Sequence, residues 1–176
     1  MMKCGKPRFD AAKMIFILYG LILIWIVLFK TAISLQDVLQ LRCTRSVNLI
    51  PFFYASDVGR LQMREVVLNV LIFVPLGIYS VMLGASWRRA ILGGLGFSLF
   101  FELCQFAFAI GAWDVTDVMA NTFGTLVGIV LYVLAGKIFG GKQKADKIIN
   151  GVAIAFSCIF FAIAILLFAA NRVELF

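Results

Sequence analysis

Histidine is absent from this sequence, and charged residues are scarce. The chain has 176 residues and no His, so the commonest general base and metal ligand is missing. Charged residues make up 14% of the chain, whereas about 25% is usual in a soluble domain. A chain of this length cannot hide its 63% hydrophobic residues in one small core. These features exclude a soluble enzyme and a soluble nucleic-acid-binding protein.

Other signals are missing as well. The sequence has no internal repeat, no proline-rich linker and no low-complexity tract, which favours a single domain over residues 1–176. Its 4 cysteines do not have the spacing of a metal site. We therefore expect no metal, no cofactor and no nucleic-acid partner.

Long apolar runs are the main feature that the sequence does have. Membrane-spanning helices need about 20 apolar residues, and the runs lack the period-two alternation of barrel strands. We expect an all-α membrane protein, a bundle of five transmembrane helices at about residues 14–31, 66–84, 90–110, 117–136 and 148–170.

Lysine and arginine are distributed unevenly between these helices. The connections at Arg88–Arg89 and 137–147 are rich in cations, whereas the 111–117 connection has none. Because cytoplasmic loops carry an excess of Lys and Arg, we expect the N-terminus to be cytoplasmic and the C-terminus outside. Segment 30–65 is the exception, because it is expected outside and contains Lys30, Arg42, Arg45, Arg60 and Arg64. Whether its 36–65 part is interfacial or re-entrant stays open.

Polar residues inside the apolar runs are costly in a membrane, so each is a functional candidate. The helical rise places them in the outer half of the second, third and fourth helices. This predicts a polar pocket open to the outside, with the cationic segment at its rim. The candidate ligand-binding residues are Asn69, Glu102, Gln105, Asp114, Asp117, Asn121, Arg42, Arg45, Arg60 and Arg64.

Structural roles are the alternative for several of these residues. Asn69, Gln105 and Asn121 can form hydrogen bonds between helices and hold the bundle together. Asp117 can serve as a helix N-cap. No nucleophile–base arrangement is present, so we assign no catalytic residue. Four further residues, expected to serve helix packing or a hinge, are Pro75, Gly77, Gly124 and Gly128.

Several of these residues form an ordered set of motifs. Asn48-Leu-Ile-Pro-Phe52 is followed by Asn69-Val-Leu-Ile-Phe-Val-Pro-Leu-Gly77, by Glu102-Leu-Cys-Gln105, and by Asp114-Val-Thr-Asp117 with Asn121, Gly124 and Gly128. In this order, over about residues 45–135, they resemble the VanZ-like family. Two features differ, because Gly111-Ala-Trp113 stands where the family often has an Arg, and Thr116 where it often has an acidic residue.

The resemblance implies a bacterial cell-membrane protein linked to low-level glycopeptide resistance, especially to teicoplanin. It supplies no mechanism, so three hypotheses stay open: binding or shielding at the outer face, transport of a polyprenyl-linked lipid, and an intramembrane carboxylate enzyme. The arginines suit a pyrophosphate and the carboxylates suit amines or sugar hydroxyls, which favours binding. The expected partners are membrane lipids, a lipoglycopeptide or a lipid-linked cell-wall precursor, and a second copy of the chain.

Overall fold

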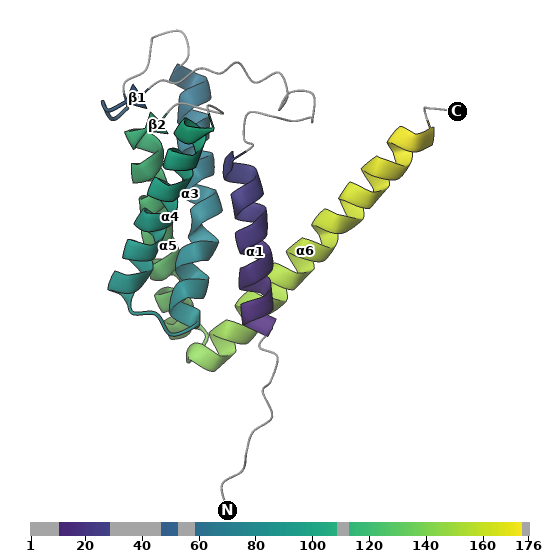
Figure 1. Ribbon diagram of the computed structural model, residues 1–176. Helices are drawn as coiled ribbons and strands as arrows, with labels where there is room; N and C mark the ends of the chain where they lie inside the picture. Colours follow the sequence, from purple (N-terminus) through teal and green to yellow (C-terminus); the bar gives the residue numbers. More distant parts are fainter. Residues whose placement is uncertain (1–10, 29–46, 53–58, 109–112, 174–176) are drawn as a thin grey trace, which may run out of the picture.

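The computed structural model describes residues 11–28, 47–52, 59–108 and 113–173, and this part is almost entirely helical (Figure 1). Two short strands, β1 (Val47–Asn48) and β2 (Trp113–Asp114), pair in parallel. The predicted all-α class is confirmed, and each predicted apolar run contains most of one helix. The helices are α1 (Ala11–Leu28), α3 (Gly59–Met82), α4 (Trp87–Ala107), α5 (Val115–Ile138) and α6 (Lys142–Val173).

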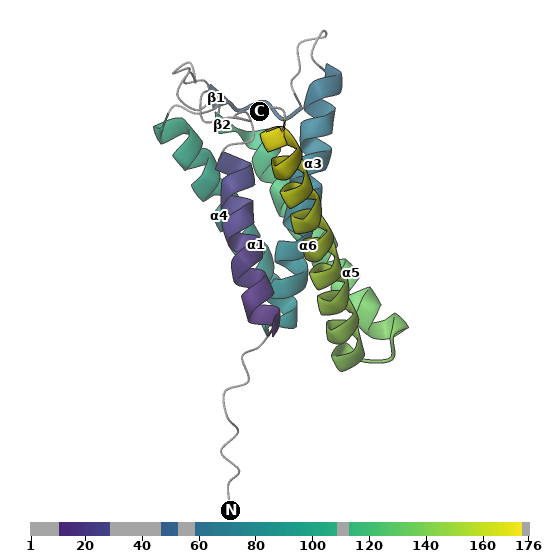
Figure 2. The same ribbon diagram turned by 90° about the vertical axis from the view of Figure 1, so that its right-hand side faces the viewer.

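Helices α3, α4 and α5 form the body of the bundle. Helix α1 lies beside α3 and α4, and α6 starts at one end of the bundle and diverges from it (Figures 1 and 2). Helices α1, α4 and α6 run upward in Figure 1, whereas α3 and α5 run downward. Helices α3 and α5 are therefore parallel to each other, and they make the most extensive helix–helix contact in the described chain.

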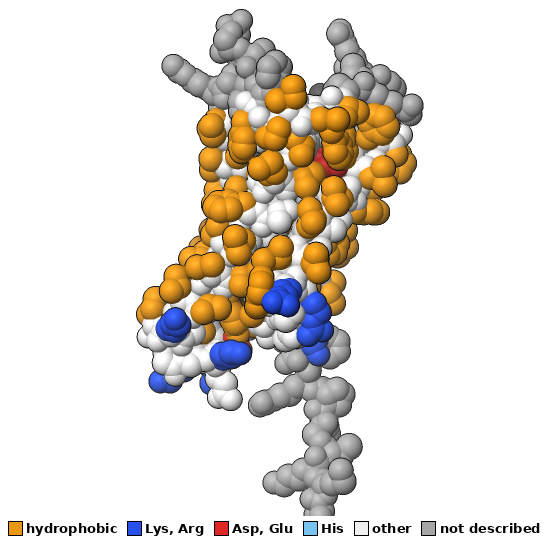
Figure 3. All heavy atoms as spheres, turned by 90° about the vertical axis from the view of Figure 1, so that its left-hand side faces the viewer, with side chains coloured by type: hydrophobic (Ala, Val, Ile, Leu, Met, Phe, Trp, Pro, Cys, Tyr) orange, Lys and Arg blue, Asp and Glu red, His pale blue; other side chains and the backbone are white. Residues whose placement is uncertain are grey.

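The two ends of the bundle differ in charge. One end, called the basic end below, holds the α3–α4 and α5–α6 connections and the start of α1. Figure 3 shows Lys and Arg side chains gathered there, below a surface made largely of hydrophobic side chains. The opposite end, called the carboxylate end, holds Glu102, Asp114 and Asp117. The cations of the basic end are Lys13, Arg88, Arg89, Lys137, Lys142, Lys144 and Lys147.

Three helices of the described chain are long and apolar enough to cross a membrane. These segments are Met63–Met82, Trp87–Ala107 and Val115–Ile138, and α1 adds a shorter apolar helix over Ala11–Val27. Large hydrophobic side chains are exposed along them, as expected for a surface that faces lipid (Figure 3). The helices support the prediction of a membrane protein. Five spans and the orientation of the termini stay predictions.

Glycines bring α3 and α5 into backbone contact. A methyl group added at Gly124 would overlap the carbonyl oxygen of Val70, and one at Gly128 would overlap that of Val74. Gly77 on α3 lies equally close to the backbone of α5. Small residues in this pattern let membrane helices approach closely and gain van der Waals contact.

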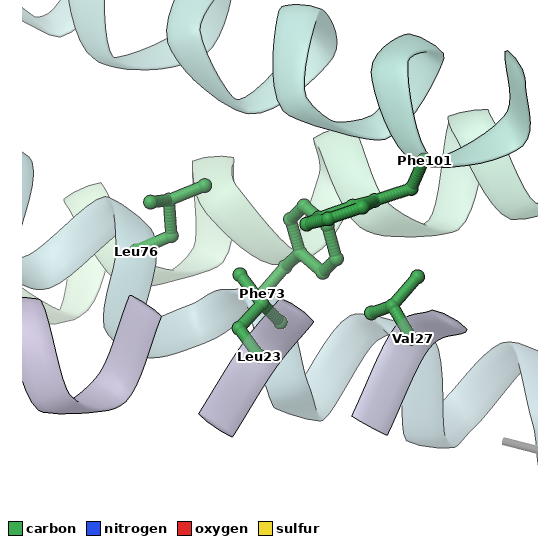
Figure 4. Close-up of a cluster of buried hydrophobic side chains, with 5 residues drawn as sticks. All are labelled: Leu23, Val27, Phe73, Leu76 and Phe101. Carbon is green, nitrogen blue, oxygen red and sulfur yellow. The ribbon is translucent and has the colours of Figure 1, made fainter. Parts of the chain in front are cut away.

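Aromatic and aliphatic side chains fill the space between α1, α3 and α4. Phe73 is fully buried, and its ring meets Phe101 edge-on, with centroids 6.5 Å apart and planes at 85°. Leu23 and Val27 from α1 and Leu76 from α3 complete the cluster (Figure 4). This cluster attaches α1 to the body of the bundle.

Pro75 lies inside α3 without ending it. The helix continues to Met82, although proline has no N–H to donate to the carbonyl of Leu71. At the next residue, Ile72, the backbone carbonyl accepts a hydrogen bond from the Tyr19 hydroxyl of α1 (2.6 Å). A neighbouring helix thus supplies a hydrogen bond close to the position where Pro75 removes one from the backbone, as is common in membrane helices.

Two tyrosine hydroxyls connect α6 to the bundle near the basic end. Tyr132 of α5 donates to a carboxylate oxygen of Asp146 (2.8 Å). Tyr79 of α3 donates to the side-chain oxygen of Asn150 (3.1 Å). These bonds hold the first turns of α6 while the rest of the helix diverges (Figure 1).

We expect Tyr132→Phe to lower the free energy of unfolding by about 1 kcal/mol, because one hydrogen bond is lost. The measurement is the thermal unfolding midpoint of the purified protein in detergent. Asp146→Asn and the double variant complete a double-mutant cycle. Strictly additive effects of the two changes would show that these side chains do not interact.

Candidate functional site

The paired strands bring two distant segments together at the carboxylate end. Asn48 pairs with Asp114 in the ladder, and its side-chain amide donates to Oδ2 of Asp114 (3.2 Å). Oδ1 of Asp114 accepts from the backbone N–H of Thr116 (2.7 Å), so Asp114 caps α5. The capping role that the sequence offered for Asp117 therefore belongs to Asp114, and Asp117 lies in the first turn of the helix.

Glu102 connects the end of α4 to the start of α5. Its side chain is 1% exposed, and Oε2 accepts from the backbone N–H of Asp114 (2.9 Å). A carboxylate in an apolar bundle is costly unless it is hydrogen-bonded, so this contact helps Glu102 to stay buried. Glu102, one of the predicted ligand-binding residues of the third helix, is thus part of the α4–α5 junction.

Asp117 and Asn69 connect α5 to α3. The amide nitrogen of Asn69 donates to Oδ1 of Asp117 over 2.6 Å. Both side chains are buried, with 6% of Asn69 and 8% of Asp117 exposed. This hydrogen bond lies next to the glycine contacts of the same two helices, on the side of the carboxylate end. The polar and the close-packed parts of the α3–α5 interface are therefore adjacent.

Gln105 and Asn121 also form hydrogen bonds between helices. The amide nitrogen of Gln105 donates to the carbonyl oxygen of Val27 on α1 (2.7 Å), and that of Asn121 donates to the Ser98 hydroxyl on α4 (2.8 Å). These contacts fit the structural role that the sequence left as an alternative. Ser98 was missed by the sequence analysis. Its position four residues before Glu102, on the same face of α4, is the signal that points to it.

The contacts between the antiparallel helices α4 and α5 fix their register. Ser98 contacts Asn121, and Gly94 packs against the side chain of Thr125 one turn farther from the carboxylate end. The same spacing places Glu102 at the level of Asp117. We name these the first level (Glu102 and Asp117), the second level (Ser98 and Asn121) and the floor (Gly94 and Thr125).

Segment 47–52 crosses the carboxylate end. The backbone N–H of Phe52 donates to the hydroxyl of buried Thr116 (3.1 Å), and that of Ile50 donates to the side chain of Asn48 (3.2 Å). Phe52 has a φ of 56°, which is unfavourable for a residue with a side chain. Leu49, Ile50 and Phe52 are exposed. The segment therefore places apolar side chains outward, beside the buried carboxylates.

The predicted cationic rim is described only in part. Arg64 is exposed near the start of α3, at the carboxylate end. Arg42, Arg45 and the side chain of Arg60 lie outside the described residues. Within the described residues, no group of three or more Cys, Asp or Glu side chains is arranged to hold a metal ion.

Comparison with known proteins gives a consistent result. The model of the VanZ/LLP1 family matches residues 16–136, which include every site residue described above. The chain is also similar to Protein VanZ of Enterococcus faecium, with 39% identity over 142 residues that cover 78% of this chain and 82% of that protein. No solved structure matches. As its motifs predicted, the chain belongs to the VanZ/LLP1 family.

Proposed function

We propose that this protein is a multi-pass protein of the bacterial cell membrane that lowers susceptibility to teicoplanin. It does so by binding or shielding a lipoglycopeptide or a lipid-linked cell-wall precursor at the outer face. One observation carries the proposal: two carboxylates, Glu102 and Asp117, are buried at the same level of an apolar bundle, at the end opposite the basic end.

The charge asymmetry supports the orientation. Cytoplasmic loops of membrane proteins carry an excess of Lys and Arg, so the basic end faces the cytoplasm and the carboxylate end faces outward. This arrangement gives a cytoplasmic N-terminus, because α1 starts at the basic end, and places the end of α6 outside. The first level then lies on the side of the membrane where glycopeptides act on the cell wall.

The chemistry of the carboxylate end suits a polar headgroup. Carboxylates and side-chain amides recognise amines and sugar hydroxyls by charge-assisted hydrogen bonds. Arginine recognises phosphate in the same way, and Arg64 lies near the start of α3, at this end. We propose that Arg42, Arg45 and Arg60 complete the phosphate contacts, while Asn69, Glu102, Asp114 and Asp117 contact the rest of the headgroup.

The test is teicoplanin susceptibility and teicoplanin binding in cells that express Glu102→Gln or Asp117→Asn at equal levels. These changes keep the shape of each side chain and remove its charge. Losing one charged hydrogen bond of roughly 1.5–3 kcal/mol lowers affinity by about 10- to 100-fold. We expect susceptibility to rise to that of cells without the protein.

Glu65→Gln is the matched control, because Glu65 is an exposed carboxylate on α3 near the same end. It removes the same charge without touching the buried cluster, so resistance is expected to persist. Binding is measured in parallel with purified protein in lipid vesicles. Resistance that is unchanged in both Glu102→Gln and Asp117→Asn would refute the proposed site.

A further inference from the structure

One of the two polar atoms of the Asn121 side-chain amide forms a hydrogen bond, and the other does not. Its side chain is 2% exposed, and its nitrogen donates to Ser98 (2.8 Å). Its oxygen Oδ1 is buried and has no hydrogen-bond partner among the described residues. Turning the amide over only exchanges the atom that faces Ser98. Because buried polar atoms in proteins are nearly always paired with protein or water, this oxygen calls for a donor.

The floor cannot supply that donor. The Thr125 hydroxyl donates to the backbone carbonyl of Asn121 (3.1 Å) and is therefore already used. Gly94 packs so tightly on Thr125 that a methyl group there would overlap the threonine side chain. Toward the basic end, α5 continues with the Gly128 backbone contact to α3. The floor therefore closes the second level toward the basic end, whereas the first level, one turn away on the other side, carries polar side chains.

We propose that the second level binds a water molecule that comes from the carboxylate end and donates an O–H to Oδ1 of Asn121. A buried water needs two to four polar partners. The Ser98 oxygen and the first-level carboxylates are the polar groups next to this position along α4 and α5. The inference rests on the proposed function for the outward orientation of the carboxylate end.

The site is then a recess that is open at the carboxylate end and closed at the floor. Asn121 lies six residues beyond the start of α5, so water reaches about 9 Å along the helix. The floor, one turn deeper, stays dry. A ligand that binds at the first level from outside displaces or uses this water, and no hydrated path continues through α4 and α5 past the floor.

Silver ions test this arrangement, because they are close to water in size and bind thiolates, which form only where water reaches the sulfur. In a chain whose cysteines are replaced by serine, Ser98→Cys, Asn121→Cys and Thr125→Cys are introduced one at a time. Silver is added to the outside of vesicles of known protein orientation. The thiols that remain are then counted by maleimide labelling in denaturant.

We expect the cysteines at 98 and 121 to react and the one at 125 to react at least about tenfold more slowly. Ser98→Cys is nearly isosteric and decides the outcome if Asn121→Cys does not fold, as judged by gel filtration. An unreactive cysteine at 98, or one at 125 that reacts equally fast, overturns the inference. No antibiotic or precursor is present, so this result is independent of the teicoplanin test.

Discussion

Gly128→Ala is expected to destabilise the folded protein by about 3 kcal/mol or more. The added methyl group would overlap the carbonyl oxygen of Val74, which is part of the α3 backbone and cannot rotate away. Overpacking costs about 1–3 kcal/mol when side chains can adjust, and here two helices have to separate. Gly124→Ala meets the carbonyl of Val70 and is expected to behave in the same way.

The measurement is the thermal unfolding midpoint and the yield of monodisperse protein in detergent. Gly136→Ala is the matched control, because it lies on the same helix and an added methyl group meets nothing within 4 Å. It is expected to gain about 0.5–1 kcal/mol from alanine's better helix propensity. Equal stability of Gly128→Ala and Gly136→Ala would contradict the backbone contact between α3 and α5.

Asn69→Asp is expected to abolish folded protein at neutral pH. The amide nitrogen of Asn69 lies 2.6 Å from Oδ1 of Asp117. The change therefore places two carboxylates in contact in a buried environment, where they repel each other. A buried charge that loses its compensating partner costs about 3–5 kcal/mol. The loss is measured as the fraction of expressed protein that stays monodisperse after extraction.

The exchange variant Asn69→Asp with Asp117→Asn separates this repulsion from a general intolerance of change. It restores one carboxylate and one amide to the pair, with the charge now on α3. We expect its stability to return to within about 1 kcal/mol of the original protein. If the double variant is as unstable as Asn69→Asp alone, the contact between the two side chains is not what the substitution disturbs.

The helices could be predicted because hydropathy is a local property. Each apolar run contains most of one observed helix, but α3 begins at Gly59, well before its predicted start near residue 66. Its first turns hold Arg60, Gln62, Arg64 and Glu65, which lower the hydropathy without disfavouring a helix. The missing part is therefore the polar end of a helix that extends beyond its apolar run.

The sequence predicts the site only as far as the helical repeat determines which side chains share a face. Glu102 and Gln105, three residues apart on one face of α4, are both buried, yet they bond to different segments. Glu102 accepts from the start of α5, and Gln105 donates to α1. A face is set by sequence spacing, whereas the partner of each side chain depends on which helices meet there.

The pairing of Asn48 with Asp114 could not be predicted from a pattern. The two residues are 66 positions apart, and strands of two residues have no periodicity to detect. The motif around Asn48 marked the segment as part of the family resemblance. Its contact with the α5 cap emerges only when β1 and β2 are placed side by side.

The hydrogen bonds that join α3 and α4 to the start of α5 have a consequence for biosynthesis. The chain is made from its N-terminus, so α3 and α4 are synthesised before α5 exists. During that interval Asn69 lacks Asp117, and Glu102 lacks the N–H of Asp114. Until the fourth helix emerges, the α3–α4 hairpin therefore lacks two of the hydrogen bonds that its buried polar side chains make in the folded protein.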